Sequence, residues 1–216
     1  MRASCVIGID EVGRGPLAGP LCVGACLVPK DREAVFSRTL RGIKDSKQLT
    51  FQKREEWFCI ISEAEKRGEC AWRTSFVSHT LIDRHGISYA LRHAIRQVLR
   101  KLDADPRRTS VFLDGGIKAP IMFSTQQTVI KGDEKIPIIS AASVVAKVRR
   151  DRYMVALGRR FPKYGFETHK GYGTKRHYRA LRKYGISNVH RKSFLKKFQF
   201  PNTNFQTISN TQIQKT

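Results

Sequence analysis

Two kinds of hydrophobic pattern alternate along the chain and divide it into strands and helices. Short, nearly continuous apolar runs are typical of buried strands. Longer segments carry apolar residues every three or four positions, which is typical of amphipathic helices. The chain begins with two strands and continues with strands linked by helices, so we predict an α/β fold with a mixed sheet covered by helices on both faces. The five predicted strands are residues 5–10, 21–28, 71–77, 110–114 and 127–130.

Local signals place the ends of the predicted helices. Thr50 and Ser78 precede amphipathic segments, and each can cap the helix that follows. The longest helix is expected from near residue 138 to about residue 160. Two short basic segments, 174–184 and 190–198, come after it and predict small helical pieces at the end of the fold.

A length of 216 residues suits one domain with a small appendage. We expect a main domain over residues 1–165 and a basic helical part over residues 166–200 packed on it. The segment 201–216 is rich in Asn, Gln, Thr and Ser and has little charge. Such a segment cannot bury enough apolar surface to order itself, so we predict a disordered polar tail.

The net charge indicates a polyanionic partner, which the hydrophobic pattern alone does not. The chain has 41 Lys and Arg residues against 18 Asp and Glu residues, a formal net charge of +23. An excess of this size favours nucleic acid over acidic lipid as the partner. A generally basic surface without such a partner is the alternative.

Basic residues concentrate between residues 147 and 197, where seventeen Lys and Arg residues stand against two acids, a net charge of +15. Aromatic residues are interleaved with them. Lys and Arg for phosphates, with aromatic faces for sugars or bases, indicate a nucleic-acid surface. Tyr178, Leu181 and Tyr184 recur at helical spacing, so we expect them in the core. Tyr172 is flanked by glycines and is expected in an exposed loop.

Cysteine usage and hydropathy bear on the cellular location. There are five cysteines and no C-x-x-C pair. Cys22 and Cys26 share one strand face with apolar neighbours, which predicts buried free thiols rather than zinc ligands and fits a reducing compartment. The sequence has no long apolar signal segment and no apolar run of about 18 residues. We expect a cytoplasmic protein without a membrane partner, and a monomer.

Acidic residues end three of the apolar runs, and a glycine stands near each. They are Asp10 with Glu11, Asp114, and Asp133. If these strands are neighbours, four carboxylates converge at one edge of the sheet. Hard oxygen ligands of this kind select Mg²⁺ or Mn²⁺, and two such ions about 4 Å apart would clamp both oxygens of an in-line phosphoryl displacement. No Cys/His cluster indicates zinc, and no G-x-x-x-x-G-K-[ST] loop indicates nucleotide hydrolysis.

Each acid also has a simpler explanation. Asp114 and Asp133 each stand next to a glycine, and such pairs are typical of turns. Asp10 and Glu11 are harder to explain in this way, because they lie between buried apolar sequence and a loop rich in Gly and Pro. Consecutive strand residues point to opposite faces of a sheet. Both acids therefore reach one site only if the backbone turns at Glu11.

Several other polar residues are weaker candidates. Asp45 lies in a predicted loop, and Asp151 is expected to form ion pairs on a helix surface. Glu167 is isolated among basic residues. His169 and His177 lie in the basic region and could approach a phosphate or move a proton, but for each of them we predict a surface role.

Longer motifs share the order and spacing of one enzyme family. The chain closely resembles the type 2 ribonucleases H, specifically bacterial ribonuclease HII. The resemblance runs from residue 7 to about residue 195 and leaves out the polar tail. The matching stretches are residues 8–16, 45–47, 113–115, 131–133, 140–148 and 169–174.

The resemblance implies a ribonuclease H-like fold, with a catalytic domain over residues 1–165 and the small helical part behind it. It implies a metal-dependent endoribonuclease that cleaves the RNA strand of RNA–DNA hybrids. Such an enzyme also incises 5′ of single ribonucleotides embedded in duplex DNA, leaving 3′-hydroxyl and 5′-phosphate ends. The implied partners are these two kinds of duplex, and the implied cofactor is Mn²⁺ or Mg²⁺, with two ions during catalysis.

The family's four metal-binding, catalytic acids correspond to Asp10, Glu11, Asp114 and Asp133. The resemblance implies that Asp10 bridges two ions and that Asp133 helps to hold the ion that activates water. It implies that Glu11 and Asp114 hold the other ion.

The resemblance also implies substrate contacts. Gly13, Arg14 and Gly15 match a loop that senses the ribose 2′-OH largely through backbone groups, and the 2′-OH is the group that separates RNA from DNA. Tyr172 matches a loop tyrosine that packs on the deoxyribose 3′ of the ribonucleotide and so reads the RNA–DNA junction.

The resemblance extends to two phosphate contacts and to one position that separates the two sister types. Ser46 and Lys47 match phosphate contacts, and Pro16 stands where the sister type, ribonuclease HIII, usually has an acid. A transposase- or resolvase-type nuclease of the same fold would share the acids but give no role to the Gly-Arg-Gly loop. A non-catalytic nucleic-acid-binding module would explain the charge and Tyr172. It would leave the carboxylates unexplained, because acids that face phosphates weaken binding unless metal ions intervene.

Overall fold

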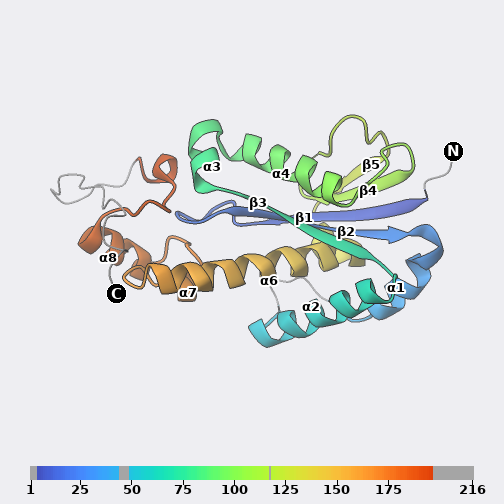
Figure 1. The fold of residues 1–216 in the computed structure, drawn as a ribbon, viewed down its shortest axis with the longest axis horizontal. Helices are drawn as coiled ribbons and strands as arrows, with labels where there is room; N and C mark the ends of the chain where they lie inside the picture. The colour runs from blue at the N-terminus through green and yellow to red at the C-terminus, as the bar shows by residue number, and fades with distance from the viewer. Residues whose placement is uncertain (1–3, 44–48, 117, 197–216) are drawn as a thin grey trace, which may run out of the picture. The chain divides into compact units, whose positions relative to one another are not determined.

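The computed structural model of the protein describes residues 4–43, 49–116 and 118–196 (Figure 1). Its strands and helices alternate as the hydrophobic pattern predicts. In chain order the elements are β1 (Cys5–Val12), β2 (Leu21–Pro29), η1 (Lys30–Arg32), α1 (Glu33–Thr39), α2 (Phe51–Lys66), β3 (Ala71–Val77), α3 (His79–His85), α4 (Ile87–Lys101), β4 (Thr109–Asp114), β5 (Gln126–Val129), α5 (Gly132–Lys135), α6 (Pro137–Arg160), α7 (Phe166–His169), α8 (Lys175–Tyr184) and η2 (Lys192–Leu195).

The strands form a mixed five-stranded sheet in the order β3-β2-β1-β4-β5, which confirms the predicted fold class. β1 pairs with β2 in antiparallel and with β4 in parallel orientation. β3 pairs with β2 in antiparallel orientation, and β5 pairs with β4 in parallel orientation. β1 is therefore the central strand, and the carboxyl ends of β1 and β4 meet at one edge of the sheet.

The predicted boundaries hold for several elements and fail for the first strand. β3 and both predicted caps are confirmed: the Thr50 hydroxyl accepts a hydrogen bond from the Lys53 amide at 3.2 Å, and the Ser78 hydroxyl accepts one from Leu81. β1 continues two residues past the expected end at Asp10, because Glu11 and Val12 still pair with β2. The acids therefore lie within the paired part of the strand.

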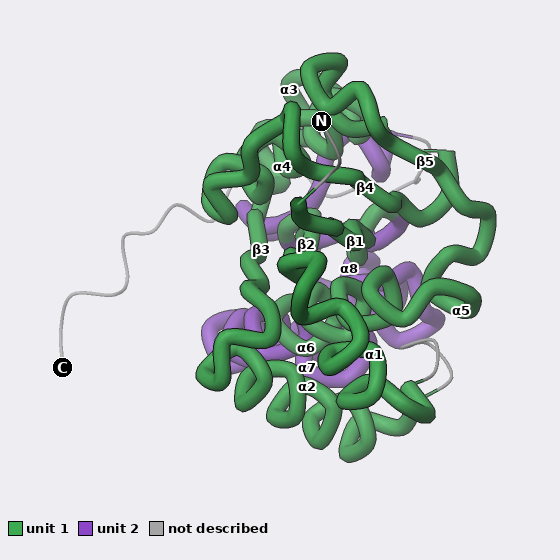
Figure 2. The backbone as a smooth tube through the Cα atoms, turned by 90° about the vertical axis from the view of Figure 1, so that its right-hand side faces the viewer, with its two compact units in different colours: residues 1–14, 20–150 green, residues 15–19, 151–216 purple. Residues whose placement is uncertain are grey.

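The described chain divides into two compact units (Figure 2). The first contains residues 1–14 and 20–150, and the second contains residues 15–19 and 151–216. The division falls inside helix α6, and the loop after β1 contributes its residues 15–19 to the second unit. The domain limits expected at residues 165 and 200 stay predictions.

In the first unit, helices cover both faces of the sheet. Helix α4 packs against β2 and β3, whereas α6 and α2 lie on the opposite side in Figure 1. Gly8 on β1 and Gly24 on β2 let α6 approach. A Cβ atom on Gly8 would lie 2.4 Å from the carbonyl oxygen of Ile138, and one on Gly24 would lie 2.5 Å from that of Ala142. These two glycines bring the first turns of α6 directly onto the strands.

The second unit has its own small core. Leu17, Met154, Phe166 and Leu181 are buried in it, and Tyr178 and Tyr184 pack against them partly buried. The core role expected for the Tyr178, Leu181 and Tyr184 spacing is confirmed. Helix α8 presents its basic side chains outward from this core, with Thr174 capping its N-terminus.

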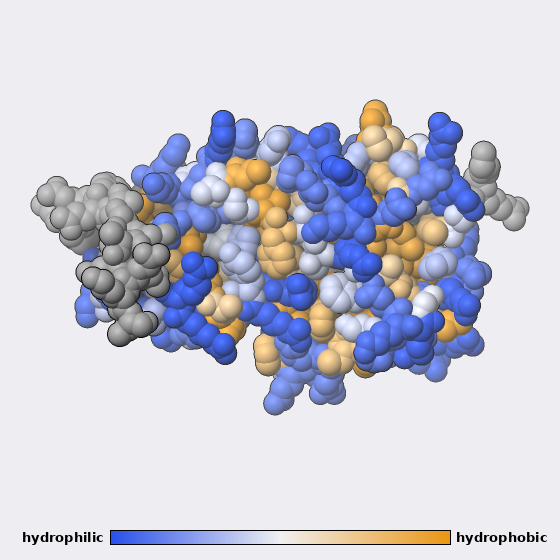
Figure 3. Space-filling model, in the orientation of Figure 1, coloured by the Kyte–Doolittle hydropathy of each residue, from blue (hydrophilic) through white to orange (hydrophobic). Residues whose placement is uncertain are grey.

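The buried thiols and the surface agree with the sequence. Cys22 and Cys26 are free and fully buried, and burial raises the pKa of the Cys22 thiol to about 12. Figure 3 shows mostly hydrophilic residues on the face drawn, with hydrophobic residues in small groups between them. Within the described ranges, no helix is long and apolar enough to cross a membrane. The cytoplasmic location and the monomeric state stay predictions.

Candidate active site

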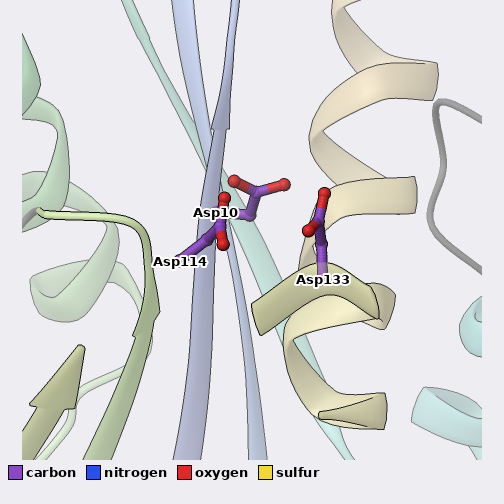
Figure 4. Close-up of side chains that lie close together, drawn as sticks. All are labelled: Asp10, Asp114 and Asp133. Carbon is purple, nitrogen blue, oxygen red and sulfur yellow. The ribbon is translucent and has the colours of Figure 1, made fainter. Parts of the chain in front are cut away.

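Three carboxylates from separate elements of the first unit point toward one another (Figure 4). Asp10 belongs to β1, Asp114 ends β4, and Asp133 belongs to the short helix α5. One oxygen atom of each lies within 4.8 Å of the others. Asp10 and Asp133 are buried, with 4% and 2% of their surface exposed, and Asp114 is half-buried. The sequence predicted the meeting of these three residues.

Asp10 lies on the sheet face that α6 covers. In the β1–β2 pairing Asp10 stands opposite Gly24, and Gly8 lies two residues before it on the same face. Because both glycines admit the α6 backbone, the Ser143 side chain on α6 reaches Asp10 and forms a hydrogen bond with its carboxylate. The Asp10 carboxylate also accepts a bond from the Glu11 amide at 2.7 Å.

A turn after β5 positions the other two acids. The Gly132 amide donates to the Asp114 carboxylate at 2.7 Å. Lys131 has a left-handed backbone with φ of 55°, and it starts helix α5, which carries Asp133. The Ser140 hydroxyl donates to the Asp133 carbonyl oxygen at 2.7 Å and ties α5 to α6. The expectation that Asp133 ends a strand is wrong, because β5 already ends at Val129.

Negative charge concentrates in this cluster and affects the protonation of Asp10. Burial raises the pKa of Asp10 to about 8, and the negative charges of Glu11 and Asp114 add to the effect. Two like charges 4.8 Å apart repel by roughly 3 kcal/mol at an effective dielectric constant near 20. Three carboxylate oxygens at this spacing fit a hard divalent cation, which would remove the repulsion.

Glu11 is not a member of the three-acid cluster. The expected turn of the backbone at this residue is wrong, since Glu11 pairs with Val23 in the regular β1–β2 register. Side-chain alternation then directs Glu11 to the opposite face from Asp10. Its carboxylate forms an ion pair with Arg14 at 3.2 Å. Glu11 nonetheless lies close enough to raise the pKa of Asp10.

We expect the metal-free protein to lose stability as the pH rises from about 4 to about 8. The folded protein holds a proton on Asp10 up to about pH 8, whereas the unfolded chain releases it near pH 3.8. The folded state therefore binds more protons across this window, and the free energy of unfolding falls with rising pH. Asp10→Asn should consequently stabilise the metal-free protein at pH 8, by on the order of 3 kcal/mol. Denaturant unfolding in EDTA at pH 5 and pH 8 measures this, and an Asp10→Asn effect equal at both pH values would contradict it.

The loop after β1 begins with a tightly packed glycine. Gly13 has a φ of 91°, and a Cβ atom there would lie 2.2 Å from Nε of Arg150. Arg150 is fully buried, and its Nε donates to the Pro20 carbonyl oxygen at 2.9 Å. One arginine of α6 thus holds the start and the end of the loop. Arg14 extends outward, with 57% of its side chain exposed.

The remaining predicted substrate contacts lie in the second unit or outside the described residues. Gly15 and Tyr172 belong to the second unit. A Cβ atom on Gly15 would meet nothing within 4 Å, and Tyr172 is 40% exposed, as its glycine neighbours predict. Ser46 and Lys47, like Asp45, lie outside the described residues.

Several residues that the sequence assigned to the surface are buried. Asp151, His169 and His177 are each less than 9% exposed, so the surface roles predicted for them are wrong. Arg150 and Arg191 are also fully buried and donate to carbonyl oxygens of the loop after β1. The basic surface between residues 147 and 197 is accordingly smaller than the count of basic residues indicates.

Two residues that organise the site, Ser143 and Arg150, were not predicted to do so from the sequence. Ser143 lies in one of the stretches that match the family but was given no role of its own, yet it bonds to Asp10. Arg150 was counted among surface charges, yet it packs on Gly13. The helical spacing contains the missing signal: Ser140, Ser143 and Arg150 share one face of α6, at intervals of three and seven residues.

Comparisons with known proteins agree on one family. The family model described as ribonuclease HII matches residues 7–203. A protein of Halalkalibacterium halodurans named Ribonuclease HII is 42% identical over 189 residues, which cover 88% of this chain and 66% of that protein. The Ribonuclease HII of Caldicellulosiruptor bescii is 43% identical over 192 residues, which cover 88% of this chain and 86% of its own length.

Solved structures show the same fold. The chain is similar to the ribonuclease HII of Archaeoglobus fulgidus, which was solved in complex with PCNA, with a TM-score of 0.69 and 25% identity over 93% of this chain and 98% of that one. The ribonuclease H2 of Pyrococcus horikoshii has a TM-score of 0.65 and 26% identity, covering 88% of this chain and 93% of its own. Bst-RNase HIII in complex with Mn²⁺ shares the fold at a TM-score of 0.60 and 19% identity, covering 89% of this chain and 65% of its own.

Proposed function

Because the chain belongs to the ribonuclease HII family, whose members are endoribonuclease hydrolases, we propose that it cleaves the RNA strand of RNA–DNA hybrids and incises 5′ of single ribonucleotides embedded in duplex DNA. One observation carries the proposal: three carboxylates within 4.8 Å of one another, in a chain of net charge +23. Acids in the middle of a polyanion-binding protein are unfavourable unless cations join them to the phosphate.

The proposed metal ligands are Asp10, Glu11, Asp114 and Asp133. Asp10, Asp114 and Asp133 supply the clustered oxygen atoms, and Glu11 adds its negative charge beside Asp10. Two Mn²⁺ or Mg²⁺ ions held there would activate a water molecule and stabilise the leaving 3′-oxygen, giving 3′-hydroxyl and 5′-phosphate ends. The divalent-metal dependence of the ribonuclease H family and the donor chemistry of the cluster support this assignment.

The protein's own residues would hold and orient these acids. The Ser143 hydroxyl and the Glu11 amide bond to Asp10, and the Gly132 amide bonds to Asp114. The two donors to Asp10 favour its charged form, which is the form that binds a cation. The arrangement limits the rotation of both side chains, which lowers the entropy lost on metal binding.

The proposed substrate contacts come from loops and the basic surface. Gly13, Arg14 and Gly15 would approach the ribose 2′-OH, and the exposed Tyr172 ring would pack on the neighbouring deoxyribose. Ser46 and Lys47 would contact phosphates. The exposed basic side chains of α8 would add sequence-independent attraction to the duplex, which salt weakens.

One cleavage experiment separates this proposal from its alternatives. Three duplexes are compared in Mg²⁺ and in Mn²⁺: all-DNA, DNA with one ribonucleotide, and a continuous RNA–DNA hybrid. The proposal predicts a cut 5′ of the single ribonucleotide, cleavage of the hybrid and none of the all-DNA duplex. Cleavage of all three duplexes would favour a transposase- or resolvase-type nuclease. Binding without cleavage would favour a non-catalytic module.

We expect Tyr172→Ala to lower kcat/KM on the single-ribonucleotide duplex by about tenfold to a hundredfold, because aromatic stacking contributes about 1–3 kcal/mol. Tyr172→Phe keeps the ring and should stay within about threefold of the wild-type protein. Tyr89→Ala is the matched control, since Tyr89 is equally exposed at 41% but lies on α4. Equal activity of Tyr172→Ala and the control would show that Tyr172 does not contact the substrate.

A further inference from the structure

A chain of buried histidines ends on the backbone of Tyr172. Nδ1 of His177 lies 2.9 Å from the Tyr172 carbonyl oxygen, and its Nε2 lies 3.0 Å from Nε2 of His190. Nδ1 of His190 accepts a hydrogen bond from the Ser187 amide at 3.0 Å. His177 and His190 are 0% and 1% exposed. No step of the proposed reaction uses either residue.

The backbone groups at the two ends determine where every proton lies. A carbonyl oxygen only accepts, so Nδ1 of His177 carries a hydrogen and donates it to Tyr172. An amide only donates, so Nδ1 of His190 has none, and its Nε2 carries the hydrogen instead. His190 then donates through Nε2 to the bare Nε2 of His177. One arrangement of two neutral rings satisfies these three contacts, and a second proton on His177 would set two hydrogens against each other.

A third histidine supports the same loop from the other side. The Gly171 amide donates to Nδ1 of His169 at 3.2 Å, and Nε2 of His169 donates to the Tyr164 carbonyl oxygen at 2.8 Å. The rings of His169 and His177 stack with centroids 4.4 Å apart. Burial lowers the pKa of His177 to about 4 and also lowers that of His169, so both rings are neutral near pH 7. The charged groups that act on His169 are Arg176 and Glu167, and their effects oppose each other.

The segment around His190 also contacts the residues that follow the Gly-Arg-Gly loop. The backbone of His190 forms a β-bridge with Ala18, and the Gly19 amide donates to the Val189 carbonyl oxygen at 2.9 Å. The Leu17 amide donates to the Gly171 carbonyl oxygen at 2.8 Å. Residues 15–19 are therefore bonded to the backbone of the residue that carries the second ring and to the backbone of the Tyr172 loop, within one compact unit.

We propose that His177 and His190 are positioning residues that hold Tyr172 at a set distance from residues 15–19 of the same unit, so that Gly15 of the 2′-OH sensor and the junction-reading ring fit one RNA–DNA step. The proposal rests on the substrate roles given to these loops above. Its chemical content is the polarity of the pair: His190 donates to His177, and His177 donates to Tyr172. A residue at position 177 must therefore offer a donor on the Tyr172 side.

Two substitutions at position 177 separate the two halves of the contact. Asparagine places its amide nitrogen near the position of the histidine Nδ1 and can still donate to the Tyr172 carbonyl oxygen. Glutamine places its amide near the position of Nε2, which keeps the contact with His190 and loses the donor to Tyr172. A buried carbonyl oxygen that loses its donor is destabilised, which shifts the Tyr172 loop away from this position. His177→Gln should lower kcat/KM for incision at the single ribonucleotide by about tenfold, and His177→Asn by less than about threefold.

The double mutant distinguishes positioning from a general loss of structure. If His177 acts through Tyr172, the double mutant of His177→Gln and Tyr172→Ala should incise no more slowly than Tyr172→Ala alone. Independent structural damage would make the two losses multiply. His85→Gln, on an exposed histidine of α3, is the control for the exchange itself. Multiplying losses, or equal losses in the Asn and Gln variants, would overturn the positioning role.

A measurement on the wild-type protein tests the proton arrangement without relying on activity. Long-range ¹⁵N–¹H spectra of the histidine rings should show the Nδ1–H tautomer for His177 and the Nε2–H tautomer for His190 and His169, with no titration of His177 between pH 6 and 8. A protonated pair, or the Nε2–H tautomer at His177, would overturn the chain even if every variant at position 177 failed to fold. If Tyr172→Ala incised at the wild-type rate and the tautomers were as expected, the proton arrangement would stand and the proposed substrate role of Tyr172 would be wrong.

Discussion

Asp10→Asn should abolish metal-dependent cleavage, lowering the rate on a ribonucleotide-containing duplex by about a thousandfold or more, because the acid at the centre of the cluster loses its charge. Asp10 is buried on the face of β1 that α6 covers, and its replacement would leave Asp114 and Asp133 as the charged members of the cluster that could hold a cation. Asparagine keeps the shape and can still accept a bond from Ser143. The measurement is single-turnover cleavage in Mg²⁺ and in Mn²⁺.

Duplex binding and unfolding of the Asp10→Asn variant show whether a loss of cleavage comes from a loss of binding or folding. Asp10→Asn should still bind the duplex, since the basic surface is unchanged, and it should unfold no more easily than the wild-type protein. Asp31→Asn removes an acid from an exposed position, where 77% of the side chain is accessible, and should cleave normally. Retained cleavage by Asp10→Asn at the wild-type rate would remove the metal centre from the mechanism.

Gly8→Ala is expected to cause the largest loss of stability, more than about 3 kcal/mol in the free energy of unfolding. The new methyl group would lie 2.4 Å from the Ile138 carbonyl oxygen and 2.8 Å from the Ile139 amide nitrogen. Both are backbone atoms at the start of α6, so no side-chain rotation relieves the clash. The helix must move away from β1, and Ser143 would then lose its contact with Asp10.

Denaturant unfolding of Gly8→Ala beside Gly116→Ala measures this effect. A methyl group on Gly116 would meet no atom within 4 Å, so this matched exchange should change the stability by less than about 1 kcal/mol. If Gly8→Ala proved as stable as Gly116→Ala, α6 would not lie on β1 as closely as the structure has it.

The sequence was sufficient to predict the sheet and most of the acidic cluster. Asp10 and Asp114 follow apolar runs, and the parallel pairing of β1 and β4 brings such positions to one edge of the sheet. Asp133 joins them for a different reason, since it lies in a short helix after the sharp turn at Lys131. The sequence marked the residue correctly, but the hydrophobic pattern does not distinguish a strand end from such a turn.

The misplaced residues were those whose environment depends on contacts distant in the sequence. Arg150 and Arg191 looked like members of a charged surface, yet each is buried against carbonyl oxygens more than a hundred residues away. His169 and His177 are buried for a similar reason, because backbone groups of the Tyr172 loop satisfy their ring nitrogens. Composition alone does not reveal that a basic residue is satisfied internally.

Glu11 shows the limit of arguing from a motif. Its place next to Asp10 led to the expectation of a backbone turn, but the antiparallel register with β2 continues through Val12. A local rule, side-chain alternation along a strand, describes this residue better. Asp10, Asp114 and Asp133 are therefore the residues on which the account of the metal centre rests, with Glu11 as a proposed fourth ligand.

Calorimetric titration with Mn²⁺ in the absence of substrate measures whether the three acids form a metal centre. The wild-type protein should bind Mn²⁺ with a saturable heat and release protons near pH 7, since burial and neighbouring charges raise the pKa of Asp10 to about 8. Asp10→Asn should show no saturable binding, and Asp31→Asn should bind as the wild-type protein does. Equal Mn²⁺ binding by Asp10→Asn and the wild-type protein would contradict a metal centre built on the three acids.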